Sequence, residues 1–177
     1  MRKIVLGLGI SLDGYIARLD GSVDFLFMPK DYSMAPFFKT IDTAILGRKT
    51  YIDGLKMGGN FASYKMAFYV FSNTEPPGQR NSVTFVNEPP KPFVEKSLKQ
   101  PGKDIWLMGG GELARSFLKD DLVDELYLGV VPTLIGEGRP LFPPGFPQRE
   151  FSLLENKTFS KGMIALKYKR TGRRSKP

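Results

Sequence analysis

The chain has 177 residues, 41% of them apolar, and its 26 basic and 18 acidic residues give a net charge of +8. This length and apolar content predict one domain with its own core, and no apolar run approaches the roughly 20 residues of a membrane span. The chain has no histidine and no cysteine, which excludes a Ser-His-Asp triad, a cysteine nucleophile, a disulfide and the usual zinc site. We therefore expect a cytoplasmic protein without a metal, and an enzyme of this composition would depend on a cofactor.

Apolar and β-branched runs bounded by turn residues predict strands, and apolar residues at three- and four-residue spacing predict helices between them. The expected strands are 3–10, 43–46, 66–72, 82–86, 104–108, 125–131, 151–159 and 163–169. The expected helices are 32–40, 49–55, 92–99 and 111–118. Because strands and helices alternate through residue 120, the sheet should be mainly parallel with right-handed crossovers.

Two acidic residues lie between the first strand and the first helix, and each has a local explanation. Asp13-Gly14 is a favoured tight-turn pair. Asp31 directly precedes the helix expected at 32–40, where a carboxylate can cap the first turn.

The strand 43–46 ends in a segment suited to an anion. Gly47 provides a turn, and Arg48, Lys49 and Thr50 begin the next helix. The helix dipole disfavours cations in a first turn, so two cations and a hydroxyl there indicate a bound phosphate. Solvated surface charge is the alternative explanation.

Two further strand ends are polar or glycine-rich. Ser72 and Asn73 lie at the end of the strand 66–72, where short polar side chains cap, turn or contact a ligand. Three glycines, 109–111, separate the strand 104–108 from a helix, and free amides without side chains admit a phosphate. A tight turn is the alternative for the glycines. Together the three strand ends predict an extended ligand with more than one phosphate, bound at the carboxyl ends of parallel strands.

The end of the chain has a different pattern. The segment FSLLENKTFSKGMIALKYKR contains two strand-like runs joined by Ser160-Lys161-Gly162, which predicts an antiparallel hairpin. We therefore expect one domain over residues 1–168. Residues 169–177 hold five basic residues and no acid, which is typical of a solvated, frayed tail, with polyanion contact as the less favoured alternative.

Five segments in chain order carry a family resemblance. They are S-L-D-G-Y-I-A, D-T-A-I-L-G-R-K-T-Y, V-F-S-N-T, W-L-M-G-G-G-E-L and L-Y-L-G-V-V-P-T-L-I-G-E-G-R-P-L-F. In this order they resemble the dihydrofolate reductase-like superfamily, most closely the branch of the bacterial riboflavin-biosynthesis reductase domain and its small single-domain relatives.

The resemblance implies a dihydrofolate reductase-like three-layer α/β fold with a mixed, mainly parallel sheet, a C-terminal antiparallel hairpin and flanking helices. It implies an NADPH-dependent oxidoreductase that transfers hydride to a small heterocyclic or sugar-derived C=N or C=O group, as 5-amino-6-(5-phosphoribosylamino)uracil reductases do. A small molecule is then the expected partner, rather than nucleic acid or a membrane. Relatives are often dimers and exposed edge strands need cover, so a homodimer is expected.

The resemblance also implies a cofactor site. By motif match, the cofactor-binding residues are Ile16, Ala17, Gly47, Arg48, Lys49, Thr50, Ser72, Asn73, Asn87, Met108, Gly109, Gly110, Gly111, Glu112 and Leu113. Residues 16–17 would meet the nicotinamide, 47–50 the pyrophosphate and the 2′-phosphate that favours NADPH over NADH, and 111–113 the pyrophosphate. Residues 72–73 would lie beside the adenosine, with Asn87 at its far edge, and the glycine run would hold a cis Gly-Gly bond.

For catalysis, the acid of folate reductases matches Asp31, and Asp13 is the second candidate. Either would donate or orient a proton if burial raised its pKa, in a cleft between residues 13–17, 31–38 and 108–110. The substrate stays open: Gly129 replaces a hydroxyl residue of folate reductases, and Tyr15 replaces a basic residue of riboflavin-pathway enzymes. Activity on a pterin and a non-enzymatic nucleotide-binding module are the alternatives.

Overall fold

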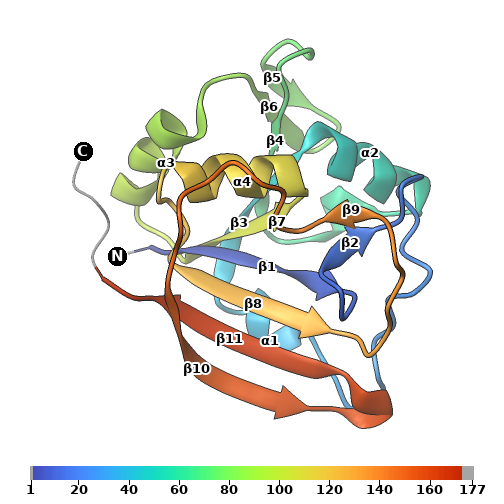
Figure 1. Cartoon of the computed structure of the whole chain (residues 1–177). Helices are drawn as coiled ribbons and strands as arrows, with labels where there is room; N and C mark the ends of the chain where they lie inside the picture. Colours follow the sequence, from blue (N-terminus) through green and yellow to red (C-terminus); the bar gives the residue numbers. More distant parts are fainter. Residues whose placement is uncertain (1, 173–177) are drawn as a thin grey trace.

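A computed structural model describes residues 2–172, which form a nine-stranded sheet and a second, two-stranded sheet (Figure 1). The strands are β1 (Ile4–Ile10), β2 (Tyr15–Ala17), β3 (Ile41–Gly47), β4 (Ala67–Phe71), β5 (Gly78–Arg80), β6 (Val83–Val86), β7 (Asp104–Gly109), β8 (Glu125–Val130), β9 (Arg139–Pro140), β10 (Phe151–Thr158) and β11 (Ile164–Arg170). The helices are α1 (Ala35–Phe38), α2 (Arg48–Lys56), α3 (Pro90–Lys99) and α4 (Gly111–Lys119). Among these described helices, none has the length and apolarity to cross a bilayer.

The large sheet has the order β10-β11-β8-β1-β7-β3-β4-β6-β5. Its centre is parallel, because β8, β1, β7, β3, β4 and β6 pair in parallel. The last two strands form the expected antiparallel hairpin, and β11 also runs antiparallel to β8. The sequence-based expectation of a mainly parallel sheet with a C-terminal hairpin is therefore confirmed.

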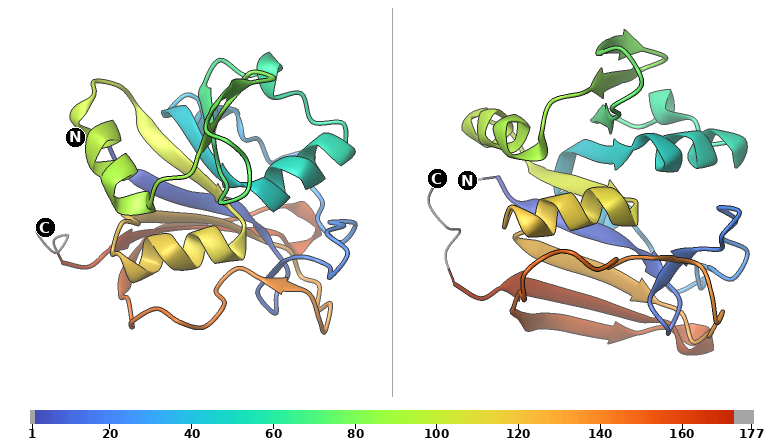
Figure 2. Two further views of the ribbon diagram at one scale, coloured as in Figure 1. Left: turned by 90° about the horizontal axis from the view of Figure 1, so that it is seen from above. Right: turned by 45° about the horizontal axis from the view of Figure 1, so that its top comes forward.

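Side-chain alternation along the central strands builds a core on each face of the sheet. Ile45 packs into one core together with residues of α3 and α4. Ala44 and Leu46 face the opposite core, which contains Tyr51 of α2. Successive side chains of a strand point to opposite faces, so these two cores give three layers. Figure 2 shows α4 crossing the sheet in front of its central strands.

The first helix is much shorter than the predicted 32–40. It begins after Met34, and Pro36 lies in its first turn. A proline in a helix interior would clash with the carbonyl four residues earlier, so a helix cannot run through Pro36 from residue 32. The prediction that Asp31 caps this helix is consequently wrong. Three short strands, β2, β5 and β9, were not predicted, because two or three residues carry no alternating pattern.

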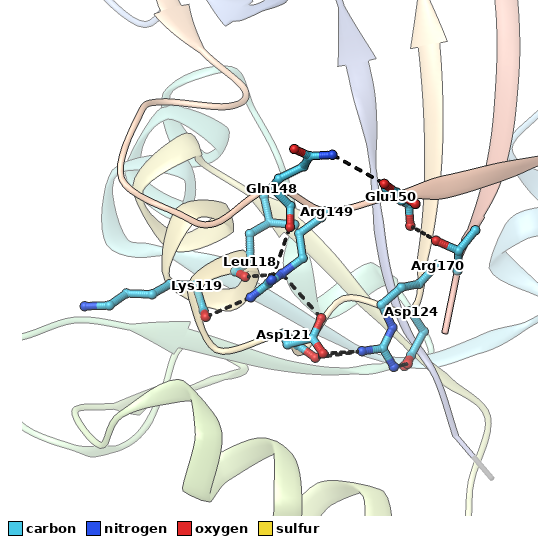
Figure 3. Close-up of polar contacts among 9 residues, drawn as sticks. Leu118, Lys119, Asp121, Asp124, Gln148, Arg149, Glu150 and Arg170 are labelled. Carbon is cyan, nitrogen blue, oxygen red and sulfur yellow. Dashed lines mark hydrogen bonds and ion pairs between the residues drawn. The ribbon is translucent and has the colours of Figure 1, made fainter. Parts of the chain in front are cut away.

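The final strand begins and ends one residue later than predicted, and it anchors part of the basic segment. β11 extends to Arg170, two residues past the expected end of the domain at 168. The Arg170 side chain is only 9% exposed and lies 2.6 Å from Asp121, which Arg149 also approaches at 3.4 Å (Figure 3). Lys169 and Arg170 therefore belong to the folded domain, and residues 173–177 of the predicted tail lie outside the described part of the chain.

Candidate functional site

The neighbouring parallel strands β3 and β7 both end in glycine and lead directly into helices. Gly47 precedes α2 and Gly110 precedes α4, and neither helix has a side-chain hydrogen bond at its N-cap. The two caps lie side by side, since a Cβ placed on Gly47 would be 3.8 Å from the Gly110 nitrogen. Two sets of first-turn amides, each at the positive end of a helix dipole, therefore meet at one edge of the sheet.

The three consecutive glycines have three separate reasons. Gly109 has φ +93°, a conformation that side chains disfavour, and its peptide bond to Gly110 is cis, as the family resemblance implied. A Cβ on Gly110 would lie 3.2 Å from the Thr50 hydroxyl oxygen and 3.5 Å from Ile16 Cδ1. A Cβ on Gly111 would collide with the carbonyl oxygen of Pro140.

A cavity of about 910 Å³ opens in front of these helix ends. Its size lies near the upper end of the range for small-molecule sites, which suits an extended ligand. The predicted cofactor residues Ile16, Ala17, Gly47, Arg48, Lys49, Thr50, Ser72, Asn73, Asn87, Met108, Gly110, Gly111, Glu112 and Leu113 all line it. Gly109 does not line the cavity; its backbone turns the chain toward it.

The loop after β4 forms part of the cavity wall. The buried Ser72 hydroxyl accepts hydrogen bonds from the Thr74 and Glu75 amides, so it shapes this loop. Glu75 in turn lies 3.0 Å from the Arg48 guanidinium, which holds that cation at the cavity wall. Arg48 and Lys49 are both exposed, so an anion can reach them from the cavity.

The cavity wall also contains an ion pair that the sequence did not reveal. Asp53 lies on α2, and its carboxylate is 2.7 Å from the Arg139 guanidinium, which also donates to the Leu19 carbonyl oxygen. Both side chains line the cavity, along with other residues that sequence reasoning missed, among them Leu8, Gly21, Val23, Gly138, Pro140 and Pro143. The available signal was the spacing from Thr50 to Asp53, because residues three apart share one face of a helix.

Asp13 lies outside the residues that line the cavity and fixes a loop. Its carboxylate accepts hydrogen bonds from the Ser11 hydroxyl at 2.6 Å and from the Gly136 amide at 2.8 Å, with a third from the Ile135 amide. The Ser11 hydroxyl and these backbone amides hold the pKa of Asp13 below its ordinary value. The raised pKa that a proton-donating role would require is therefore absent at Asp13.

Asp31 likewise serves the hairpin rather than the cavity. Its carboxylate accepts hydrogen bonds from the hydroxyl and the amide of Ser160, at 2.7 and 2.9 Å. Those two bonds lower the pKa of this exposed group, so the condition set for its proton-donating role, a raised pKa, is not met. Among the cavity residues, none comes from 31–38, so the predicted third wall of the cleft is also wrong.

The hydrogen bonds of Asp13 predict an acid-dependent stability. Because its folded-state pKa is lowered, the stabilisation is complete above the unfolded pKa of about 4 and disappears as the pH falls through the folded value. We expect Asp13→Asn to lower the thermal midpoint at pH 7, and we expect this gap to narrow as the pH falls below the unfolded pKa of about 4. Thermal unfolding followed by circular dichroism across this range measures the difference, and a gap that stays constant with pH would contradict the assignment.

A three-layer domain with this mixed sheet, and with a cavity at the carboxyl ends of its parallel strands, is a dihydrofolate reductase-like protein. Residues 2–165 match the model of the RibD C-terminal domain family. The chain belongs to that family.

Three relatives illustrate the range of similarity. The uncharacterized protein YwjB of Bacillus subtilis (strain 168) is 40% identical over 144 residues, covering 80% of this chain and 83% of its own. A structure described as a "putative riboflavin biosynthesis protein" from Shewanella sp. PV-4 has a TM-score of 0.84 at 26% identity, covering 97% of this chain and all of its own. The deaminase/5-amino-6-(5-phosphoribosylamino)uracil reductase of Thermotoga maritima shares the fold, with a TM-score of 0.73 and 14% identity over 96% of this chain and 56% of its own.

Proposed function

We propose that this protein is an NADPH-dependent reductase that acts on a small heterocyclic or sugar-derived C=N or C=O group. The observation that carries the proposal is the meeting of two helix N-termini without side-chain caps at one cavity of about 910 Å³, which is also lined by two cations. Helix N-termini bind phosphates through their amides and their dipoles, and a dinucleotide carries a pyrophosphate that needs such a site.

Two groups of residues would bind the two anionic parts of NADPH. The amides of Gly111, Glu112 and Leu113 would hold the pyrophosphate, while Arg48 and Lys49 would pair with the 2′-phosphate. Bound NADPH supplies the hydride for the reduction. The missing side chain of Gly110 leaves room for the dinucleotide between Thr50 and Ile16.

The Asp53–Arg139 pair in the cavity wall would orient the substrate. A carboxylate accepts hydrogen bonds from ring or amino N–H groups, and the adjacent guanidinium donates to carbonyl or phosphate oxygens. This chemistry suits an aminopyrimidine-like compound, the class of substrate for which the Thermotoga reductase is named. With no histidine or cysteine in the chain, positioning of the two reactants would supply most of the rate enhancement.

The first test is the selectivity between the two nicotinamide nucleotides. Replacing Arg48 by alanine removes a charged partner of the 2′-phosphate, and such a hydrogen bond contributes about 10- to 100-fold in affinity. We expect Arg48→Ala to weaken NADPH binding by about that factor and to leave NADH binding within about twofold. Isothermal titration calorimetry with each nucleotide measures both constants.

Arg80 provides the matched control. It also approaches Glu75, at 3.6 Å, but it does not line the cavity. Arg80→Ala should leave both dissociation constants unchanged. If Arg48→Ala weakens NADPH and NADH binding equally, Arg48 does not contact the 2′-phosphate. If Arg80→Ala weakens NADPH binding as much as Arg48→Ala does, the loss comes from the disturbed ion pairs of Glu75.

A further inference from the structure

The side chains that line the cavity carry as many negative charges as positive ones. Within residues 2–172 the charged lining residues are Arg48, Lys49, Arg139, Asp53, Glu88 and Glu112. Under the proposed function, Arg48 and Lys49 would pair with the 2′-phosphate of NADPH, a group of about −1.5 to −2 charge at neutral pH. The cofactor would therefore use both of these cations, and Arg139 is the lining cation that is left for a substrate.

Asp53 already compensates the charge of Arg139. Its carboxylate lies 2.7 Å from Nη1 of the guanidinium, and the Leu19 carbonyl oxygen accepts two further hydrogen bonds, at 3.1 and 3.3 Å, from Nη2 and Nε. These contacts use three of the five N–H donors of the arginine, which leaves two for a ligand. Arg139 can therefore donate hydrogen bonds to a neutral oxygen, but it has no uncompensated charge with which to bind a phosphate.

The N-terminus of α3 lies at the same cavity but offers few hydrogen-bond donors. Pro89 at the N-cap and Pro90 at the first helical position both line the cavity, and Pro92 follows within the first turn. Because proline has no backbone N–H, Lys91 carries the one amide of residues 89–92. This helix end therefore provides no cluster of amides for a further anion, and those of α2 and α4 would already face the phosphates of the cofactor.

We propose that the substrate carries no phosphate group, and that Asp53 excludes phosphorylated compounds by neutralising Arg139. The inference rests on the proposed function, from which it takes the cofactor's share of the cavity. A phosphorylated substrate would bring a further charge of about −1.5 to −2 close to the Asp53 carboxylate, and such juxtaposition of like charges opposes binding. In this respect the substrate differs from the phosphoribosyl compound for which the Thermotoga reductase is named.

The two polar groups of the pair define what the substrate offers instead. The Asp53 carboxylate accepts a hydrogen bond from a ring or amino N–H group, and the two remaining N–H groups of Arg139 donate to a carbonyl oxygen. A carbonyl next to an N–H group, in an uncharged ring compound, matches both. The substrate class is therefore a neutral heterocycle with adjacent C=O and N–H groups.

Replacement of Asp53 by asparagine tests the exclusion. It removes one negative charge with little change in shape, while the hydrogen bonds to the Leu19 carbonyl oxygen keep Arg139 in place. The probe is ribose 5-phosphate, titrated calorimetrically into protein saturated with NADP⁺, which fills the phosphate sites of the cofactor. The unsubstituted protein should not bind the probe at about 10 mM, whereas Asp53→Asn should bind it with a dissociation constant of about 1 mM or below.

Two control variants assign the gain to Arg139. Glu88→Gln removes the same charge from the cavity wall, but its ion-pair partner Lys96, at 2.9 Å, does not line the cavity. This variant should bind ribose 5-phosphate no better than the unsubstituted protein does. Adding Arg139→Gln to Asp53→Asn removes the guanidinium and should abolish the gained affinity.

The outcomes separate this inference from the proposed function. Absence of NADP⁺ binding to the unsubstituted protein would overturn the proposed function and this inference with it. With NADP⁺ bound, measurable binding of ribose 5-phosphate to the unsubstituted protein would overturn the inference alone. Failure of Asp53→Asn to gain affinity, or an equal gain in Glu88→Gln, would likewise overturn the assignment of the exclusion to Asp53.

Discussion

Gly110→Val should abolish NADPH binding while leaving the fold intact. The added Cβ would lie between Thr50 and Ile16, both of which line the cavity, so the methyl groups of valine would occupy space that the dinucleotide needs. Gly110 has φ −72° and ψ −167°, an extended conformation that valine adopts readily. We expect the dissociation constant for NADPH to rise by at least about 100-fold, equivalent to about 2.7 kcal/mol.

Calorimetry with NADPH measures this loss, and the thermal midpoint controls for folding. The Cβ contacts at 3.2 and 3.5 Å meet the ends of two side chains rather than backbone, so small shifts can accommodate them. The midpoint should therefore stay within a few degrees of the unsubstituted value. An unchanged NADPH affinity in a folded Gly110→Val protein would contradict the assignment of this turn.

Gly111→Ala should instead act on stability. A Cβ at this position would be forced against the Pro140 carbonyl oxygen and 3.2 Å from Pro143 Cδ, so backbone on one side or the other must move. Overpacking of this kind costs about 3 kcal/mol, which in a domain of this size lowers the thermal midpoint by about 6–12 °C. Differential scanning calorimetry of the nucleotide-free protein measures the shift.

The adjacent glycine supplies the comparison for this experiment. Gly110→Ala adds the same methyl group one residue earlier, where no backbone atom obstructs it. It should change the midpoint by much less than Gly111→Ala does. If the two variants unfold at the same temperature, close packing of α4 against the 140–143 segment is not the reason for the third glycine.

Local patterns were sufficient to locate most of the candidate site. Gly47, Ser72 and Gly110 each follow a strand with a clear apolar pattern, and the carboxyl ends of neighbouring parallel strands meet at one sheet edge. Their positions around one cavity therefore follow from the order of strands and helices. The same reasoning recovered the C-terminal hairpin from its two strand-like runs.

Long-range contacts account for the misses. Asp53 and Arg139 are 86 residues apart, and nothing in either neighbourhood encodes their ion pair. Asp31 is bound by Ser160, 129 residues later, so its polar partners and its lowered pKa depend on the folded hairpin. Arg170 looked like part of a solvated tail because its partner Asp121 is distant in the sequence.

Titration of the unsubstituted protein with NADPH and, separately, with NADH tests the central claim most directly. Isothermal titration calorimetry should give one NADPH per chain, with a dissociation constant in the micromolar range or below, and binding of NADH at least about tenfold weaker. Failure of both nucleotides to bind at millimolar concentration would contradict the account. The cavity and its glycines would then belong to the fold alone.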